Sequence, residues 1–352
     1  MEDIFGKNPM TKTKKQRYKV DWKQAKNNSI WDVVTRVTKK LTHTKPGFRR
    51  LNCAPTAAGG RVVGSSCYNK QVLGKIRDAY NRTHTSYQIT AKRPDEIYES
   101  LRKLLHEECT QEDCWLKLLS EKEREYIAEH FFSPAHPKEW NDNPRAWLSN
   151  YDIIHVLEQY EKAYPKFAFL PPSPIDFDKK MTKHRCVTND LCTFQLSEFK
   201  EKGIEKIGIV LNLDEHDESG SHWVTLYIDL PHKVIFYLDS ALNETPPEVE
   251  VLIKRIKKQG EALGISFQAR KNRITHQFSN TECGMYALFF LVSLVTDCWG
   301  GEPPCPKKSG SKSNTMTFLN RFEKKRISDG VVAKFRERYF NAPSAQLKPD
   351  GG

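Results

Sequence analysis

Hydrophobic residues within residues 51–142 recur three or four positions apart in three separate stretches. The first stretch predicts a helix over 69–80, and its apolar stripe consists of Val72, Leu73, Ile76 and Tyr80. A second helix is predicted over 94–105, where a proline stands at the first turn. A third is predicted over 120–132, where a serine and a glutamate three residues later fit a capping box. This part of the chain therefore predicts a small helical domain.

After about residue 143 the pattern changes to short apolar runs between turn residues. A helix is predicted over 150–160, a break at the prolines of 171–174 and another helix over 249–263. Strands are predicted over 206–213, 223–229, 234–238 and 266–269. The longest apolar run, 287–295, predicts a buried helix. This order of elements predicts an α+β fold with helices packed on a mostly antiparallel core.

Candidate chemistry is concentrated around the last of these strands and the buried helix. Cys283 precedes that helix, and a helix N-terminus favours thiolate over thiol. His222 precedes one strand and Asp239 follows the next, as a general base and the acid that orients it. Gln277 can stabilise an oxyanion together with the backbone N–H of Cys283, and Trp223 can wall the cleft or pack in the core. Each residue alone has an ordinary structural role, but the ordered set predicts a cysteine hydrolase.

These motifs resemble those of the ubiquitin-like-protein-specific cysteine proteases, the clan that includes SUMO-deconjugating enzymes and adenovirus endopeptidase. The matching motifs are Trp147-Leu148, His222-Trp223, Asp239, Gln277 and, after five residues, Cys283-Gly284, with the acidic Glu282 before the cysteine. The overall likeness is to polyprotein-processing proteases of large cytoplasmic DNA viruses, such as African swine fever virus and giant viruses. It covers roughly residues 145–300, and a weaker likeness covers 52–118.

The resemblance implies a papain-like or adenain-like core, with a central mixed sheet flanked by helices, and an N-terminal helical domain. It implies catalysis by His222, Asp239, Gln277 and Cys283, and substrate contacts by Trp147, Trp223 and Gly284. The implied activity is cleavage after small residues, at Gly-Gly-X sites, in viral structural polyproteins or precursors during virion maturation. One alternative is an isopeptidase acting on SUMO-like or ubiquitin-like modifiers. A second is a non-catalytic, basic DNA-binding virion protein. No cofactor is required, and nucleic acid is a candidate activator, as in adenovirus endopeptidase.

Basic charge is concentrated at the two ends of the chain. Of the formal net charge of +12, residues 1–50 carry +10 and residues 301–352 carry +6, which leaves −4 between them. Basic ends bind nucleic acid or acidic partners, or are only solvated tails, and both interpretations stay open. We predict a partly disordered basic arm over 1–50 that contacts DNA, a helical domain over 51–142, a catalytic domain over 143–300, and a linker with a basic helical region over 301–352.

Nine cysteines and a polar, basic N-terminus predict a reducing compartment, here the virion core or the viral factory in the host cytoplasm. No apolar run is long enough to cross a bilayer, so no membrane partner is expected. Four cysteines are open to two interpretations, zinc ligands or buried thiols: Cys53, Cys67, Cys109 and Cys114. A metal site at Glu215, His216 and His222 is rejected in favour of catalysis. The bond Gly60-Arg61, among small residues, is a candidate for self-cleavage.

Overall fold

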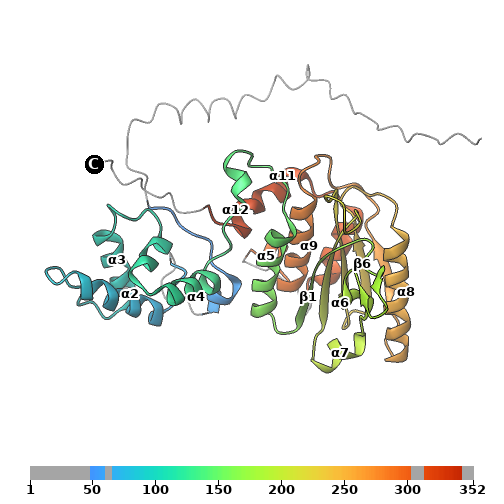
Figure 1. The fold of residues 1–352 in the computed structure, drawn as a ribbon, viewed down its shortest axis with the longest axis horizontal. Helices are drawn as coiled ribbons and strands as arrows, with labels where there is room; N and C mark the ends of the chain where they lie inside the picture. The colour runs from blue at the N-terminus through green and yellow to red at the C-terminus, as the bar shows by residue number, and fades with distance from the viewer. Residues whose placement is uncertain (1–47, 60–65, 303–312, 343–352) are drawn as a thin grey trace, which may run out of the picture. The chain divides into compact units, whose positions relative to one another are not determined.

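The computed structural model of the chain describes residues 48–59, 66–302 and 313–342 (Figure 1). Three predicted features lie outside the described residues: the bond Gly60-Arg61, nearly all of the basic arm, and most of the linker after residue 302. Within the described ranges, no helix is both long and apolar enough to cross a membrane.

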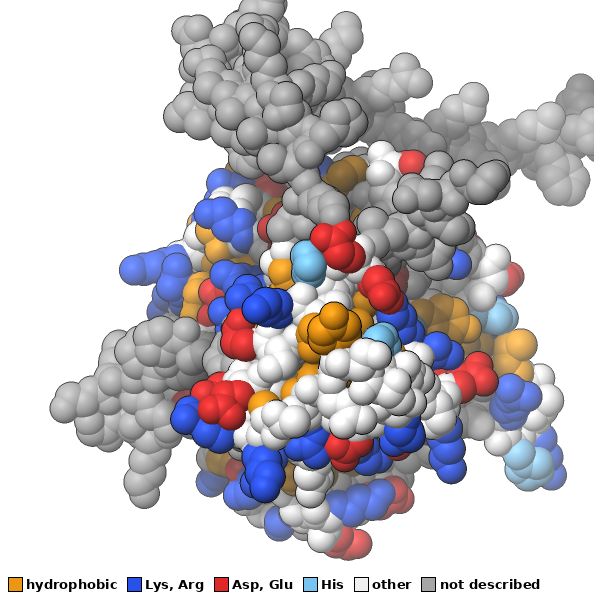
Figure 2. Space-filling view, turned by 90° about the vertical axis from the view of Figure 1, so that its left-hand side faces the viewer, with side chains coloured by type: hydrophobic (Ala, Val, Ile, Leu, Met, Phe, Trp, Pro, Cys, Tyr) orange, Lys and Arg blue, Asp and Glu red, His pale blue; other side chains and the backbone are white. Residues whose placement is uncertain are grey.

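The first described region is helical, as the apolar spacing predicts. It contains α2 (Lys70–Thr83), α3 (Pro94–Leu104) and α4 (Glu121–Phe131), with the short 3-10 helices η2 (Pro55–Gly59) and η3 (Glu112–Leu118). Asn69 caps α2, because its side chain accepts a hydrogen bond from the backbone N–H of Val72 at 2.9 Å. The helices pack around the fully buried Trp115. Figure 2 shows the face that lies on the left in Figure 1, and on its described surface basic and acidic side chains are intermixed.

A five-stranded mixed sheet forms the centre of the rest of the described chain. Its spatial order is β1 (Phe167–Pro174), β4 (Lys206–Asn212), β5 (Trp223–Asp229), β6 (Val234–Leu238) and β7 (Gln268–Lys271). The two inner pairings are antiparallel, whereas β1–β4 and β6–β7 are parallel. The expected mixed sheet is therefore confirmed, but only its middle is antiparallel. Helical crossovers return the chain in the parallel direction at both edges.

The proline-rich stretch 171–174 does not break the chain, contrary to the sequence prediction. It forms the second half of β1, and the register with β4 shifts between Leu170 and Ser173. β1 is an edge strand, where the missing N–H groups of prolines can be tolerated.

Helices cover both faces of the sheet (Figure 1). In β6, Ile235 and Tyr237 face the cluster formed with α7 (Leu196–Glu201) and α8 (Pro247–Ala262). The alternate residues Val234, Phe236 and Leu238 face the cluster formed with α5 (Asn150–Ala163) and α9 (Cys283–Thr296). This alternation follows from the period of two along a strand. The small hairpin of β2 (Lys180–Thr182) and β3 (Arg185–Cys186), followed by α6 (Asn189–Cys192), lies outside the main sheet.

The helix α9 is apolar on every side and lies within the core. All its residues from Cys283 to Val295 are buried. It approaches β4 closely at Gly208, where a Cβ atom would lie only 3.1 Å from the side chain of Leu291. A helix with no polar face is stable only when surrounded by other elements, so the core fixes where its first residue lies.

The end of the described chain is helical, as predicted, but it is part of the core. It forms α10 (Thr315–Lys324), α11 (Asp329–Val332) and α12 (Arg336–Tyr339), with the 3-10 helices η5 (Trp299–Gly301) and η6 (Ala333–Phe335) between or before them. Its buried residues join the cluster of α9 and are Leu319, Phe322, Ile327, Val332, Phe335, Tyr339 and Phe340. The predicted domain boundaries stay a prediction.

Candidate active site

Three of the predicted residues meet at one end of the sheet. His222 precedes β5, Asp239 follows β6, and Cys283 is the first residue of α9. Because β5 and β6 are antiparallel neighbours, the start of one lies beside the end of the other. Residues far apart in sequence are thus brought together by strand pairing and by the buried helix.

His222 links the other two side chains. Its Nε2 lies 2.7 Å from Asp239 Oδ1, and the ring also forms a hydrogen bond with Cys283. Since Nε2 is taken by the carboxylate, Nδ1 is the ring nitrogen that remains for the thiol. The site is shielded from water, because the side chain of His222 is 14% exposed and that of Asp239 only 1%. Cys283 is the free cysteine among the described residues.

Asp239 is held by donors on every side of its carboxylate. The backbone N–H groups of Ala241 and Asn243 donate to it at 2.8 and 2.9 Å, and the Asn243 side chain donates at 2.9 Å. Asn272 brackets its backbone by accepting from the N–H and donating to the carbonyl. Burial alone would raise the pKa of Asp239, but the hydrogen bond and charge of His222, with these N–H donors, lower it below the usual value.

The same contacts stabilise the imidazolium form of His222. Burial disfavours the charged ring, but hydrogen bonds and charges of Asp239 and Cys283 outweigh it and raise the pKa of His222 to about 9. An imidazolium can stabilise a neighbouring thiolate and can later give its proton to a leaving group, so these contacts hold His222 in the form that the reaction needs.

We expect kcat/KM to fall as the pH rises through about 9. Above that pH, His222 loses the proton that the leaving amine must receive, so the imidazolium form required for acylation disappears. A pH profile of kcat/KM measured with one peptide checks this. An alkaline limb near pH 6.5, the value of an unperturbed histidine, would contradict the assigned contacts.

Gln277 lies beside this group, and its amide is already partly engaged. It is buried, its Oε1 accepts from the Ser240 hydroxyl at 2.7 Å, and its Nε2 donates to the Ser279 carbonyl at 2.6 Å. Ser240 is next to Asp239, so Gln277 is fixed to the same end of the sheet. A side-chain amide has two N–H groups, which leaves one for a reacting carbonyl oxygen.

A groove of about 610 Å³ leads to His222, and both tryptophans of the predicted substrate site line it. Trp147 is 45% exposed, and the indole N–H of Trp223 donates to the Leu148 carbonyl at 3.0 Å. Gly284 lies against this wall, because a Cβ there would come within 3.1 Å of Leu148 and 3.2 Å of Trp223. The glycine after the nucleophile therefore allows the helix to approach the groove wall closely.

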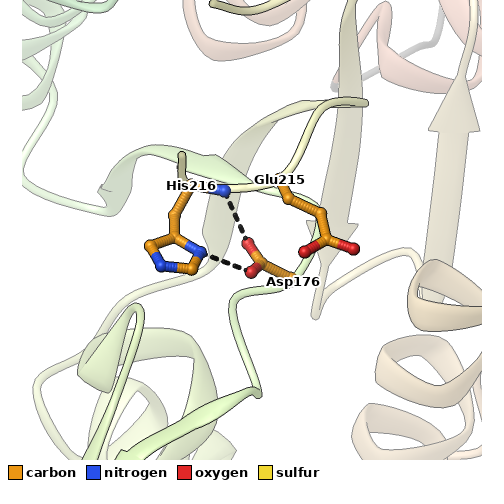
Figure 3. Close-up of side chains that lie close together, drawn as sticks. All are labelled: Asp176, Glu215 and His216. Atoms are coloured by element: carbon orange, nitrogen blue, oxygen red, sulfur yellow. Dashed lines mark hydrogen bonds and ion pairs between the residues drawn. The ribbon is translucent and has the colours of Figure 1, made fainter. Parts of the chain in front are cut away.

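One group of possible metal ligands lies on the rim of this groove, among the residues that the structure describes. It consists of Asp176, Glu215 and His216 (Figure 3). His216 Nδ1 lies 2.6 Å from Asp176, and Lys179 Nζ lies 3.0 Å from Glu215 and 3.5 Å from Asp176. The ammonium group of Lys179 thus already pairs with both carboxylates. His222, which a sequence-based metal site would include, faces Asp239 instead.

The four cysteines considered as zinc ligands form disulfides instead. Cys53 bonds to Cys67 and Cys109 bonds to Cys114, with Cα atoms 5.1 and 5.6 Å apart. A third disulfide joins Cys186 and Cys192. Sequence spacing does not show which sulfur atoms meet in space, which is why these pairs were not predicted.

Sequence reasoning missed the residues that support the site. Asn243 and Asn272 position Asp239, and Arg336 contacts Glu282 beside the nucleophile. The local signal lies in Asp239 itself, because an aspartate in a turn commonly accepts a hydrogen bond from the backbone N–H two residues on, as it does here from Ala241. Asn272 and Arg336 carried none, since their partners are distant in sequence.

Comparison with known proteins identifies relatives over the same region. The sequence profile of the Ulp1 protease family, C-terminal catalytic domain, matches residues 198–297. A protein of Acanthamoeba polyphaga mimivirus named for thiol protease activity is 29% identical over 206 residues, which cover 58% of this chain and 59% of that protein. A SUMO-1 cysteine protease of African swine fever virus is 31% identical over 211 residues, 56% of this chain and 69% of that protein.

The fold has a counterpart among solved structures. The crystal structure of an African swine fever virus protease superposes with a TM-score of 0.53 at 21% identity, covering 85% of this chain and 98% of that one. The matched region spans less than two thirds of the mimivirus protein's length. With 31% identity over more than two thirds of the African swine fever virus SUMO-1 cysteine protease, and with the matching family profile, this chain belongs to the Ulp1 family of cysteine proteases.

Proposed function

We propose that the protein is a cysteine endopeptidase that cuts after small residues, at Gly-Gly-X sites, in viral structural polyproteins or precursors during virion maturation. One observation carries the proposal. The hydrogen-bonded series Asp239–His222–Cys283 lies at the N-terminus of α9, at the end of a groove lined by Trp147 and Trp223. We place the reaction in the virion core or the viral factory, with no required cofactor.

In the first half of the reaction the thiolate of Cys283 attacks the substrate carbonyl carbon and a C–S bond forms. The carbonyl oxygen becomes an oxyanion, for which the first backbone N–H groups of α9 and the remaining N–H of Gln277 are the donors. The C–N bond then breaks, and the leaving amine takes the proton of the His222 imidazolium. The product is a thioester on Cys283.

In the second half His222, now neutral, acts as the base. It takes a proton from water while the oxygen attacks the thioester carbonyl. The C–S bond breaks, the peptide acid leaves, and the thiolate and imidazolium are restored. Asp239 holds the ring in one orientation throughout and stabilises its charged form. The net reaction consumes one peptide bond and one water.

Crowding around the nucleophile supports the proposed preference for small residues. Gly284 touches both Leu148 and Trp223, so the groove wall lies against the first turn of α9. An extended substrate without side chains next to the cut is therefore the proposed occupant, with glycine before the scissile bond and no restriction on the residue after it.

Replacing Gln277 with alanine is expected to lower kcat by about a hundredfold with little change in KM, because the lost amide acts on the oxyanion and not on the bound substrate. Gln277→Glu is the matched variant of the same shape. It keeps an acceptor for Ser240 but loses the N–H donors, and is expected to lose activity similarly. Equal kcat for Gln277→Glu and the unaltered protein would remove Gln277 from the oxyanion site.

A peptide panel tests the proposed substrate. Matched peptides with Gly-Gly, Ala-Ala or Val-Val before the cut should be cleaved in that order of kcat/KM, and Cys283→Ala should cleave none. Preference for Val-Val would contradict the crowded groove.

Basic residues 1–50, nearly all of them outside the described residues, are proposed to bind DNA. Deleting them should weaken DNA retention at low salt, an effect that added salt reduces.

A second candidate is an isopeptidase that acts on SUMO-like or ubiquitin-like proteins. The name of the African swine fever virus relative, a SUMO-1 cysteine protease, favours it. The chemistry is the same, and only the leaving amine differs. A ubiquitin-like protein joined through its C-terminus to a lysine side chain, tested beside the Gly-Gly peptide, separates the two. Faster cleavage of this isopeptide conjugate than of the peptide supports the isopeptidase.

A further inference from the structure

The C-terminal helix α12 places a buried guanidinium against the loop that carries the nucleophile. Arg336 Nε donates to Glu282 Oε2 at 3.0 Å, and the two side chains are only 6% and 3% exposed. Its Nη1 and Nη2 donate to the carbonyls of Ala146 and Thr281, each at 3.0 Å. The Trp140 ring lies 4.5 Å from the guanidinium carbon. All three nitrogens thus have a partner, as a buried arginine requires.

The carboxylate that Arg336 binds is the one nearest in sequence to the nucleophile. Glu282 is the N-cap of α9 and immediately precedes Cys283. His222 and Asp239 approach Cys283 from β5 and β6, and α12 brings Arg336 against Glu282. Without Arg336, the residue immediately before the nucleophile would carry an uncompensated buried carboxylate. A buried negative charge at this position opposes the thiolate, so its compensation by Arg336 favours the reactive form.

The same guanidinium holds the wall of the substrate groove. Ala146, whose carbonyl it binds, precedes Trp147 and also accepts a hydrogen bond from the Trp140 indole at 3.0 Å. Two residues later, the Leu148 carbonyl is bound by the Trp223 indole. One side chain therefore connects the loop before the nucleophile to the segment that presents Trp147.

The rest of the C-terminal segment holds the other end of this loop. His276 Nε2 lies 2.7 Å from the Phe322 carbonyl, and its Nδ1 accepts the backbone N–H of Ile327 at 3.1 Å. Asp329 accepts the backbone N–H of Phe278 at 3.0 Å. Phe322, Ile327 and Asp329 lie after residue 297, where the match to the family profile ends. The loop 276–282 is therefore bound at both ends by α10–α12 and the turns between them.

We infer that Arg336 is a positioning residue of the active site. It compensates the Glu282 carboxylate beside Cys283 and fixes the catalytic loop to the groove wall, so that residues 313–342 complete the site. This inference rests on the proposed function, because it requires Cys283 to react as a thiolate.

The test compares Arg336→Met with Glu282→Gln/Arg336→Met, using the full chain. Iodoacetamide labelling of Cys283, followed by mass spectrometry across pH 4–9, reports the thiolate without any substrate. The acid limb is the pH range in which the labelling rate of Cys283 falls as the pH is lowered. We expect this limb to move upward by about one pH unit or more in Arg336→Met. The double variant should return the limb toward that of the unaltered protein, because both charges are gone. In peptide assays, kcat/KM of Arg336→Met should fall about tenfold or more at pH 6.

Two further variants keep the test decisive if Arg336→Met does not fold. Glu282→Gln alone leaves the cation and should move the acid limb downward. Arg336→Lys keeps the charge and should keep the limb while losing the forked contacts. The matched control Arg338→Met removes an exposed arginine of α12 that pairs with Glu302 and should change nothing.

An acid limb that stays unchanged in every folded variant at Glu282 and Arg336 would overturn the inference and leave the pair a purely structural contact. If the unaltered protein shows normal pH-dependent labelling of Cys283 but cleaves no peptide, the substrate proposal fails while this test still stands. If Cys283 is labelled no faster than an ordinary thiol at any pH, both the proposed function and the inferred role of Arg336 fail.

Discussion

Cys283→Ala is expected to abolish peptide cleavage, lowering kcat by at least about 10⁴-fold, while the protein stays folded. The thiol is the atom that forms the covalent bond, and neither water nor a neighbouring side chain can replace it. Removing one sulfur from a buried position costs only a small part of the free energy of unfolding, on the order of 1 kcal/mol. Activity is measured with the Gly-Gly peptide, and folding by thermal denaturation.

A matched result with an alkylating reagent separates Cys283 from the other cysteines. Stoichiometric labelling should occur at Cys283 and should remove activity in parallel. The other described cysteines lie in disulfides and should not compete. Cleavage by Cys283→Ala at the rate of the unaltered protein would refute the nucleophile.

Asp239→Ala is the second large effect, with an expected loss in kcat/KM of about 10²–10³-fold. Without the carboxylate the imidazole loses its orientation and its charge partner, so the pKa of His222 falls from about 9 toward 6.5. The imidazolium is then lost at lower pH, and the alkaline limb of the rate profile moves in the acid direction. Asp239→Asn removes the charge and can hold the ring in the wrong tautomer, so it should also move this limb in the acid direction and lose at least as much activity.

The same hairpin provides a control for this prediction. Asp229 is equally buried and lies 2.8 Å from His232 Nδ1, at the opposite end of β5 from His222. Asp229→Asn therefore removes the charge of a comparable Asp–His pair away from the site, and should leave the rate profile unchanged. Equal effects of Asp229→Asn and Asp239→Asn on the profile would contradict the specific role of Asp239.

The elements around the site were predictable because they depend on local patterns. The short apolar runs 223–229 and 234–238, bounded by turn residues, predict β5 and β6, and the apolar run 287–295 predicts most of α9. These elements place His222, Asp239 and Cys283 at their ends. Strand pairing and the buried helix then bring the three side chains together. The site could be predicted because its polar residues stand at the ends of elements that the apolar runs reveal.

The sequence failed where long-range contacts decide the structure. The edge strand β1 was missed because prolines usually end a strand, and only its place at the sheet edge allows them. The charges of 301–352 suggested a basic appendage, but the apolar stripe of α10 packs on α9 instead. Arg336 was hidden for the same reason, since its partner Glu282 is 54 positions away.

A covalent trap shows whether Cys283 is the nucleophile and whether His222 activates it. The protein is incubated with a Gly-Gly peptide that carries a C-terminal electrophile, and the adduct is located by mass spectrometry, in the unaltered chain and in His222→Ala. We expect one adduct, on Cys283, formed at least about a hundredfold more slowly when His222 is absent. An adduct on another residue, or labelling of Cys283 at the same rate in His222→Ala, would contradict this expectation.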